Sequence, residues 1–500
     1  TSGLLLGLAF PCNPDQPLAN LFHPLWAYVG LVPLLSALPG GNFGHGFKRG
    51  LLTGFVLTMV GLYWVGHTQG GGLAVVGGTI LIGGYLGVFV GIFAACTNVA
   101  VARWGERGFV LVPLVWTIQE YLLSLGELGF PWLLLGHSQA VFPTIIQYAS
   151  ITGVYGVSFW VASANAALFL IMSSSGRVRF ALMGSLAAWI LIPWLHGRWV
   201  IADGFETDET IRVAVVQPNL MREGKWGPGG LERSFEVLEE LSRKAAQQHP
   251  DLLVWPETAL PCYLRLRPDC RERLESFVRE IRIPVLTGAS DYNRELREPY
   301  NAAFLVRPEG GEMAAYAKMH LVPFGERTPF RDRIPLLRNI DWSKLTGDLG
   351  PAEFAPGNER TLFRNKKADF AVLICFESVF PDLTRRAVLN GARLLVNITN
   401  DSWFGRTSGP YQHALLAVLR AVENRTAIAR CATTGISVFI DSFGRSFDAT
   451  SIYEPNYRVA DVPVRTETTF YTRNGDLFAH LVFALTALAV ACLRFTESKT

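Results

Sequence analysis

Charged side chains are scarce in this chain. Only 17% of its 500 residues are Asp, Glu, Lys or Arg, whereas a soluble globular protein has roughly 25%. The formal net charge of +3 is too small for a nucleic-acid-binding surface, so we expect no nucleic-acid partner. The deficit lies mainly in residues 1–197, which hold six Lys or Arg. We therefore expect one part of the chain to lie in a membrane and another in water.

Several sequence patterns for metal and nucleophile chemistry are also missing. The seven cysteines form no C-x-x-C pair and have no histidines at zinc-binding spacing. Neither G-x-S-x-G nor H-E-x-x-H occurs, so serine-hydrolase and metalloprotease interpretations lack support. We expect no metal and no cofactor. Cys262 and Cys270 are the close pair in the water-exposed part, and whether they form a disulfide stays open.

Long apolar runs are abundant, by contrast. They cover about 25–38, 51–66, 73–100, 108–125, 146–172 and 180–196, and several approach the roughly 20 residues that span a bilayer. The opening TSGLLLGLAF is typical of the end of another span that starts before it, and residues 477–493 form a last one. The sequence predicts a membrane α-helical bundle of eight transmembrane helices, seven in a domain at 1–197 and one at 476–494.

The basic residues predict the orientation of these spans. They lie in alternate connections, as the pairs Lys48 and Arg49, Arg103 and Arg107, and Arg177 and Arg179. Cytoplasmic connections are enriched in Lys and Arg, so residues 198–475 are expected outside the cytoplasm.

Two further features describe the membrane part. Gly83, Gly87 and Gly91 recur at four-residue spacing, which would let two membrane helices approach closely. Glu120 is the clearest ionisable residue within a span, and a coupled transporter usually needs more. We interpret the spans as an anchor and platform.

The region 210–465 has the alternating pattern of an α/β domain. We expect strands at 211–219, 251–257, 283–290, 301–306, 368–377, 392–400 and 436–444. Helical patterns cover 231–248, 269–282, 381–391 and 411–430; in the last of these, Leu415, Leu419, Val422 and Ile428 share an apolar face.

Three residues of this domain could form one catalytic site. Glu257 follows an apolar strand that ends at Trp255-Pro256, Lys318 lies in a mostly apolar stretch, and Cys375 ends the strand pattern VLICFE. Each has a plain alternative: a loop glutamate, a surface lysine and a core thiol. Together they are the base, the cation and the nucleophile that acyl transfer requires. The N–H of Phe376 could help to bind an oxyanion.

Their order and surroundings resemble the nitrilase (carbon–nitrogen hydrolase) superfamily. The matching stretches are VWPETALP, KMHLVPFGE, LICFESVFP and NITNDSWFG. The resemblance implies a nitrilase-like αββα sandwich and a Glu257–Lys318–Cys375 triad. Seven leading spans and one final span resemble the branch that N-acylates bacterial lipoproteins. That branch takes an acyl chain from a phospholipid through a cysteine thioester and passes it to the α-amino group of an apolipoprotein's diacylglyceryl-cysteine.

The resemblance implies further site residues. Glu326 matches an essential glutamate, and Glu377 and Trp226 match functionally important positions. Phe376 stands where relatives commonly have tyrosine, so any role of that hydroxyl is lost. Trp403 and Phe404 either line the pocket or only pack.

The partners expected are the phospholipid donor, the apolipoprotein acceptor and membrane lipids, and we expect a monomer. Residues 320–342 mix Pro, Phe, Leu and Arg, and we interpret this segment as a mobile lid. Two alternatives remain open: a membrane-anchored amidase or nitrilase that hydrolyses a C–N bond, and a transporter or receptor with a ligand-binding outer domain.

Overall fold

The computed structural model describes residues 1–38, 40–68, 72–204, 209–338 and 353–497. These residues form two compact units. The first contains the described parts of 1–67, 72–204 and 473–497, and the second contains residue 68 and the described parts of 209–472. Each unit is described here by itself.

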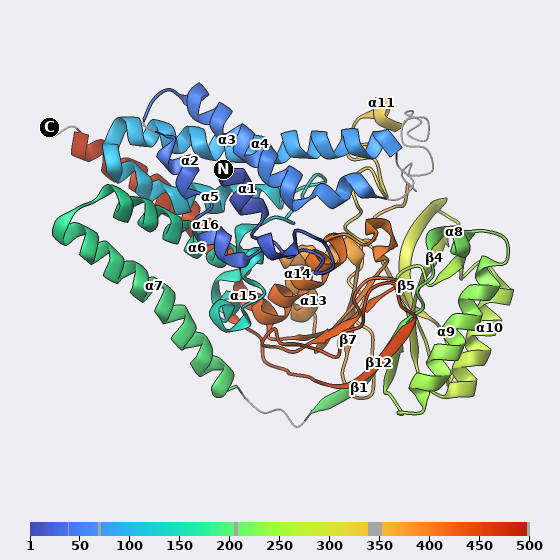
Figure 1. Cartoon of the computed structure of the whole chain (residues 1–500). Coiled ribbons are helices and arrows are strands. Elements are labelled where there is room, and N and C mark those ends of the chain that lie inside the picture. Colours follow the sequence, from blue (N-terminus) through green and yellow to red (C-terminus); the bar gives the residue numbers. More distant parts are fainter. Residues whose placement is uncertain (39, 69–71, 205–208, 339–352, 498–500) are drawn as a thin grey trace. The chain divides into compact units, whose positions relative to one another are not determined.

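The first unit is helical. Its main helices are α3 (Phe43–Gly61), α4 (Gly72–Trp104), α5 (Leu111–Leu123), α6 (Ala149–Ser173), α7 (Gly176–Ala202) and α16 (Leu477–Glu497) (Figure 1). Among the described residues, three segments are long and apolar enough to cross a membrane: Gly72–Leu123, Ala149–Ser173 and Gly176–Ala202. The apolar part of α16, Leu477–Cys492, is shorter. The unit is therefore that of a membrane protein, although these helices are fewer than the eight spans expected.

The start of the chain differs most from the expected spans. The run 25–38 is broken into a 3₁₀ helix, Pro24–Tyr28, and the short helix α2 (Val32–Ser36). Both pieces begin with a proline in the first turn, where the ring is tolerated, whereas proline inside a helix interrupts it. Helix α1 (Ser2–Gly7) is also short, and α3 begins eight residues before the apolar run at 51–66.

Helices α3 and α4 pack closely through glycines on both sides. A Cβ on Gly87 of α4 would lie 2.9 Å from the carbonyl oxygen of Leu51, and one on Gly50 of α3 would lie 2.3 Å from that of Val90. Any side chain there would collide with backbone, so the contact requires glycine. The predicted role of the α4 glycines is confirmed, and α3 contributes a matching set that sequence reasoning missed: Gly46, Gly50 and Gly54.

The second unit is built on two sheets. The first has the order β12-β1-β2-β4-β5-β6, with β3 also paired to β4, and the second has the order β11-β10-β9-β8-β7. The first contains β1 (Thr210–Gln217), β2 (Leu252–Val254), β3 (Leu260–Tyr263), β4 (Val285–Asn293), β5 (Glu298–Val306), β6 (Ala314–Ala317) and β12 (Asn456–Pro463). The second contains β7 (Phe370–Ile374), β8 (Leu394–Thr399), β9 (Ala427–Ala432), β10 (Val438–Ile440) and β11 (Ser446–Phe447).

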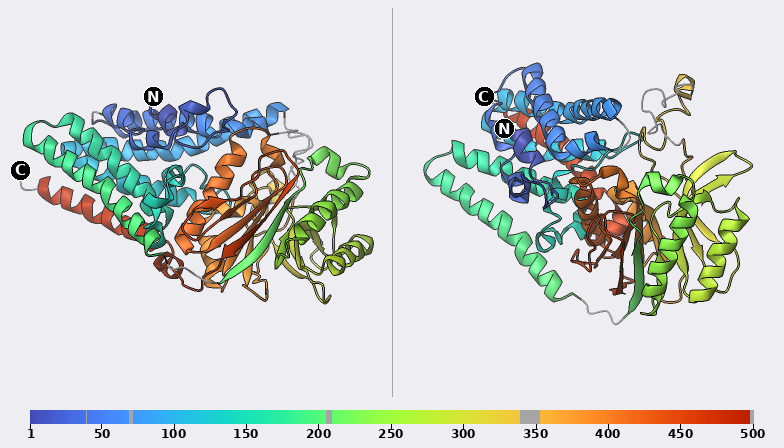
Figure 2. Two further views of the ribbon diagram at one scale, coloured as in Figure 1. Left: turned by 60° about the horizontal axis from the view of Figure 1, so that its bottom comes forward. Right: turned by 45° about the vertical axis from the view of Figure 1, so that its right-hand side comes forward.

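The two sheets share one apolar core, and helices cover their outer faces. Buried residues from both sheets, such as Val213, Val254, Val372 and Val396, belong to the same cluster. Helices α9 (Gly230–Ala246) and α10 (Pro268–Ile281) pack on the first sheet, and α13 (Pro381–Leu389) and α14 (Gly409–Asn424) on the second. In both views of Figure 2, α9 and α10 lie on one side of the strands and α14 on the other. The predicted αββα arrangement of this unit is confirmed.

Two expectations about its elements need revision. Helix α14 ends at Asn424, Arg425 takes a left-handed conformation, and Ile428 belongs to strand β9; the helix expected to reach residue 430 is therefore too long. Because the expected helix included most residues of β9, that strand was not predicted. Four further strands were also missed: β3, β6, β11 and β12. A disulfide joins Cys262 of β3 to Cys270 of α10.

Candidate active site

Glu257 lies just after β2, in a tight loop at the carboxyl end of the strand. The loop presses onto β4, where a Cβ on Gly288 would lie 2.7 Å from the Cα of Glu257. The carboxylate is 5% exposed. Asn301 Nδ2 donates to its Oε1 (2.7 Å), and the backbone N–H of Asn400 donates to Oε2 (2.8 Å). These bonds fix both oxygens and stabilise the charged carboxylate.

Lys318 follows β6 directly and is buried, with 1% of its surface exposed. Its Nζ lies 2.8 Å from Glu326 Oε2 and 3.5 Å from Glu257 Oε1. Burial by itself lowers the pKa of Lys318, but the carboxylates of Glu326 and Glu257 outweigh burial and raise the pKa above its ordinary value. The side chain is therefore a permanent ammonium ion.

Cys375 follows β7 and begins a 3₁₀ helix, Cys375–Val379. Its φ of +52° lies in the left-handed region that non-glycine residues rarely adopt. Burial, together with the charge of Glu257, raises the pKa of the thiol, and Lys318 only partly offsets this increase. The sulfur is therefore protonated at rest, so it needs a base at the moment it reacts.

Asn301 connects the two carboxylates. Its side-chain amide donates to Glu257 Oε1 at 2.7 Å and to Glu326 Oε1 at 3.0 Å. The backbone N–H of Val322 holds the other oxygen of Glu326 at 2.9 Å. Two acids beside one lysine would repel each other, and the shared amide reduces that repulsion. Sequence reasoning counted Asn301 only as the start of a strand; a polar amide directly before the apolar run AAFLV was the available signal.

Glu377 is buried in a set of hydrogen-bond donors. Its Oε1 accepts from the Tyr316 hydroxyl (2.8 Å) and from the backbone N–H groups of Met319 (2.7 Å) and His320 (3.2 Å). Its Oε2 accepts from the N–H of Ile374 at 2.7 Å. Burial raises its pKa to about 7. The carboxyl group thus ties the segment after β6 to the end of β7, which are the two segments that carry the lysine and the cysteine.

The remaining expected site residues are placed more loosely. Phe376 is buried edge-on to Phe380, with ring centroids 5.0 Å apart. Trp226 ends the short helix α8 (Arg222–Trp226) and is exposed. Trp403 and Phe404 are half-buried in the 3₁₀ helix Asp401–Phe404.

Beside Trp226, the buried Lys225 was overlooked. Its Nζ donates to Thr258 Oγ1 at 3.0 Å, next to Glu257. Burial lowers the pKa of Lys225 to about 8, although the charge of Glu257 opposes the decrease. A second cation therefore supports the loop that carries Glu257.

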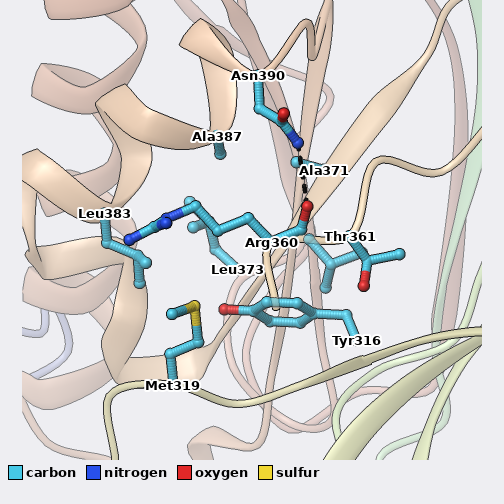
Figure 3. A pocket seen from close by; sticks show the side chains of 10 residues that line it. Tyr316, Met319, Arg360, Thr361, Ala371, Leu373, Leu383, Ala387 and Asn390 are labelled. Atoms are coloured by element: carbon cyan, nitrogen blue, oxygen red, sulfur yellow. Dashed lines mark hydrogen bonds between the residues drawn. The ribbon is translucent and has the colours of Figure 1, made fainter. Parts of the chain in front are cut away.

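A small pocket lies next to this machinery. Figure 3 shows that Tyr316 and Met319 line it together with Arg360, Leu383 and other residues of β7 and α13. It shares Tyr316 and Met319 with the surroundings of Glu377 but includes none of Glu257, Lys318 and Cys375. The pocket is therefore not the reaction site.

The expected lid falls partly outside the described residues, which omit 339–352. Its described part contains the short helix α11 (Pro335–Arg338) and the exposed side chains of Phe324, Ile334 and Leu336. The proposed motion stays a prediction.

Comparisons with known proteins cover nearly the whole chain. A family model described as "Apolipoprotein N-acyltransferase N-terminal domain" matches residues 2–167, and one described as "Carbon-nitrogen hydrolase" matches residues 212–473. An apolipoprotein N-acyltransferase of Geobacter metallireducens is 36% identical over 99% of this chain and 94% of its own length. One of Chlorobaculum tepidum is 34% identical over 97% of this chain and 93% of its own length.

Solved structures show a more distant likeness. An amidase of Nesterenkonia sp. AN1, in a form with the acetamide moiety of fluoroacetamide on its active-site cysteine, is 19% identical. The match covers 56% of this chain and all of that chain, with a TM-score of 0.40.

Proposed function

Since the chain belongs to the apolipoprotein N-acyltransferase family, we propose that it transfers an acyl chain from a phospholipid to a lipoprotein amine through a thioester on Cys375. The observation that carries this proposal is the network of Glu257, Lys318 and Glu326, of which the Glu257 and Lys318 charges act on the Cys375 thiol. Full-length similarity to relatives with this name favours acyl transfer over the amidase alternative.

In the first half-reaction, Glu257 removes the thiol proton as Cys375 Sγ attacks the ester carbonyl carbon. The negative oxygen that forms is stabilised by the Lys318 ammonium and by the Phe376 N–H. The C–O bond then breaks, and Glu257 returns the proton to the departing alcohol of the lysophospholipid. The acyl group remains on sulfur as a thioester.

In the second half-reaction, the α-amino nitrogen of the diacylglyceryl-cysteine attacks the thioester carbonyl. Glu257 accepts the amine proton, the C–S bond breaks, and the proton returns to the Cys375 sulfur. An amide is released and the enzyme is restored. Use of one thiol for both steps predicts ping-pong kinetics.

We also propose eight spans, with the catalytic unit on the periplasmic side of the inner membrane. The arrangement of basic residues in the first unit supports this topology. Gly46, next to Lys48 and Arg49, packs against Asn98, close to Arg103. The first two basic pairs therefore lie at the same end of the antiparallel α3–α4 pair.

The third basic pair lies at that end too. The ring of Phe109, just after Arg107, is 4.5 Å from that of Phe169 near the end of α6, and Arg177 and Arg179 follow α6. Basic residues gathered at one end fit the positive-inside rule.

Mass spectrometry after incubation with phospholipid alone tests the proposed chemistry. We expect an acyl-sized mass increase on the peptide that contains Cys375. Cys375→Ala should abolish the increase. Cys431→Ala should retain it, because that thiol is buried and its Sγ lies 3.3 Å from the backbone oxygens of Val216 and Val254. No mass increase on the wild-type peptide would contradict the proposal.

A further inference from the structure

A buried polar chain lies against the nucleophile and has no part in the mechanism above. His413 of α14 is fully buried, and its Nδ1 is 2.9 Å from Asp401 Oδ1. Asp401 in turn accepts a hydrogen bond from Arg430 Nη2 at 2.8 Å and one from Thr399 Oγ1 at 3.0 Å. A carboxylate held on both oxygens fixes the orientation of the imidazole ring, as second-layer partners do in other active sites.

The other ring nitrogen reaches the backbone of the nucleophile. His413 Nε2 lies 3.2 Å from the carbonyl oxygen of Cys375, and the Ser378 hydroxyl donates to the same oxygen at 3.0 Å. The peptide bond between Cys375 and Phe376 is planar and trans, so its C=O and N–H point in opposite directions. Groups that hold the carbonyl oxygen therefore also set the direction of the Phe376 N–H.

We propose that His413 is a positioning residue for acyl transfer, which fixes the Cys375–Phe376 peptide so that the Phe376 N–H is aimed at the oxyanion. This inference rests on the proposed function, in which that N–H stabilises the transition state. A hydrogen bond to the carbonyl also polarises the amide and makes its N–H a better donor. The left-handed conformation of Cys375, with φ of +52°, is one that needs such support from its surroundings.

The charge of the ring decides how many bonds it makes. A carboxylate and a carbonyl only accept, so His413 donates to both only as an imidazolium. Burial, helped by the Arg430 guanidinium on β9, lowers its pKa, while Asp401 and the carbonyl of Cys375 raise it. Below the pKa of His413, the ring therefore donates both to Asp401 and to the Cys375 carbonyl oxygen. On the alkaline side Nε2 is an acceptor, and the Ser378 hydroxyl, 3.0 Å from the Cys375 carbonyl oxygen and 3.4 Å from Nε2, can donate to either.

Two substitutions separate the two ring nitrogens. His413→Gln places a side-chain amide N–H near the position of Nε2. The shorter side chain of His413→Asn places its amide N–H only near the position of Nδ1. We would measure single-turnover acylation of Cys375 by phospholipid, and separately its alkylation by iodoacetamide, each over a pH series from 4 to 8, because the pKa of His413 is lowered from its ordinary value. Alkylation uses the thiol but develops no oxyanion, so it does not depend on the Phe376 N–H.

For His413→Asn at the acid end of the series we expect acylation to fall about 10- to 100-fold, somewhat less than the loss of a whole oxyanion donor, with alkylation within about threefold of wild type. The deficit should shrink as the pH rises through the pKa of His413. His413→Gln should acylate within about threefold of wild type at the acid end, and at least as fast as wild type at the alkaline end, because an amide donor does not titrate.

Glu423→Gln is the matched control on the same helix. Glu423 is fully buried and paired with Arg420 at 2.7 Å, so its loss should lower thermal stability but leave acylation unchanged. The inference is overturned if His413→Asn acylates at the wild-type rate over the whole pH series. It is also overturned if both reactions fall together, or if His413→Gln is as impaired as His413→Asn. Absence of a Cys375 thioester in wild type would instead refute the proposed function.

Discussion

At the scale of single residues, the site combines two carboxylates with one buried ammonium. The acids Glu257 and Glu326 share one lysine and one amide, Lys318 and Asn301. The proposed nucleophile, Cys375, is a protonated thiol, because burial outweighs the effect of the Lys318 ammonium on its pKa. In a site of this kind the carboxylate base is ionised while the thiol stays protonated. The protonated thiol limits unproductive reactions of the sulfur before substrate arrives.

Glu377 gives a prediction about pH. Its pKa is about 7 in the folded chain, against an ordinary value of 4.5, so between these values the folded state keeps a proton that the unfolded state loses. Its contribution to stability is thus present below pH 4.5 and is lost as pH rises through 7, by up to about 3 kcal/mol. Glu377→Gln lacks this titration. The stability gap between wild type and variant should therefore narrow from pH 5 to pH 8.

Thermal unfolding in detergent at pH 5 and pH 8 measures the stability difference between wild type and Glu377→Gln. The contributions of other titrating groups are the same in both proteins and cancel in this difference. A gap that stays constant or widens with pH would contradict the assigned role.

Glu257 and Cys375 could be proposed from sequence because each follows a recognisable apolar strand, whereas Lys318 was proposed from its mostly apolar surroundings, since strand β6 was missed. Their supports could not be proposed in this way, since Asn301, Asn400 and His413 act through contacts between segments that lie far apart in the sequence. The role of Glu377 also became clear only from its donors. Its carboxyl group is fully buried by the elements around it.

At the scale of elements, the turn after β7 stores backbone strain at Cys375. Glycine avoids about 1–2 kcal/mol of left-handed strain but loses roughly 0.5–1 kcal/mol through the greater entropy of its unfolded chain. We therefore expect Cys375→Gly to be about 0.5–1 kcal/mol more stable than Cys375→Ala, with both variants inactive. Thermal unfolding of the two variants compares them directly. An alanine variant as stable as the glycine variant would show that the turn is unstrained.

The α3–α4 contact gives a second prediction at this scale. Gly87→Leu should lower the stability of the protein in detergent by about 1–3 kcal/mol, because its Cβ would meet the backbone of Leu51. A Cβ on Gly84 of the same helix would meet no described atom of another element within 4 Å, so Gly84→Leu is the control and should unfold like wild type. Equal effects of both substitutions would argue against the close packing.

Element boundaries were the weaker part of the sequence interpretation. The apolar face of α14 seemed to continue through Ile428, because a short buried strand of apolar residues has no periodicity that separates it from a helix. The left-handed Arg425 ends the helix, and no glycine marks that position. Strand β12 was missed because its residues alternate only partly between buried and exposed.

At the scale of the whole molecule, the proposed topology makes a labelling prediction. A cysteine at Arg297, in the exposed turn between β4 and β5, should react in intact cells with a maleimide that reaches the periplasm but does not cross the inner membrane. A cysteine at the exposed Arg107 should react only after that membrane is permeabilised. The reverse pattern would place the catalytic unit in the cytoplasm.

The division into a helical and an α/β part followed from the distribution of charge, which bilayer and water impose directly. The number of spans did not follow as securely. A proline stands in the first turn of each of the two short helical pieces that form the run 25–38, so the count of eight spans stays a prediction.

The most direct test of the account is a two-step transfer. The enzyme is incubated with a phospholipid that carries a labelled acyl chain, separated from the lipid, and then given a peptide that begins with diacylglyceryl-cysteine. The account predicts that label leaves Cys375 and appears on the peptide's α-amino nitrogen as an amide. Label that is released as free fatty acid at the same rate with and without the peptide would contradict it.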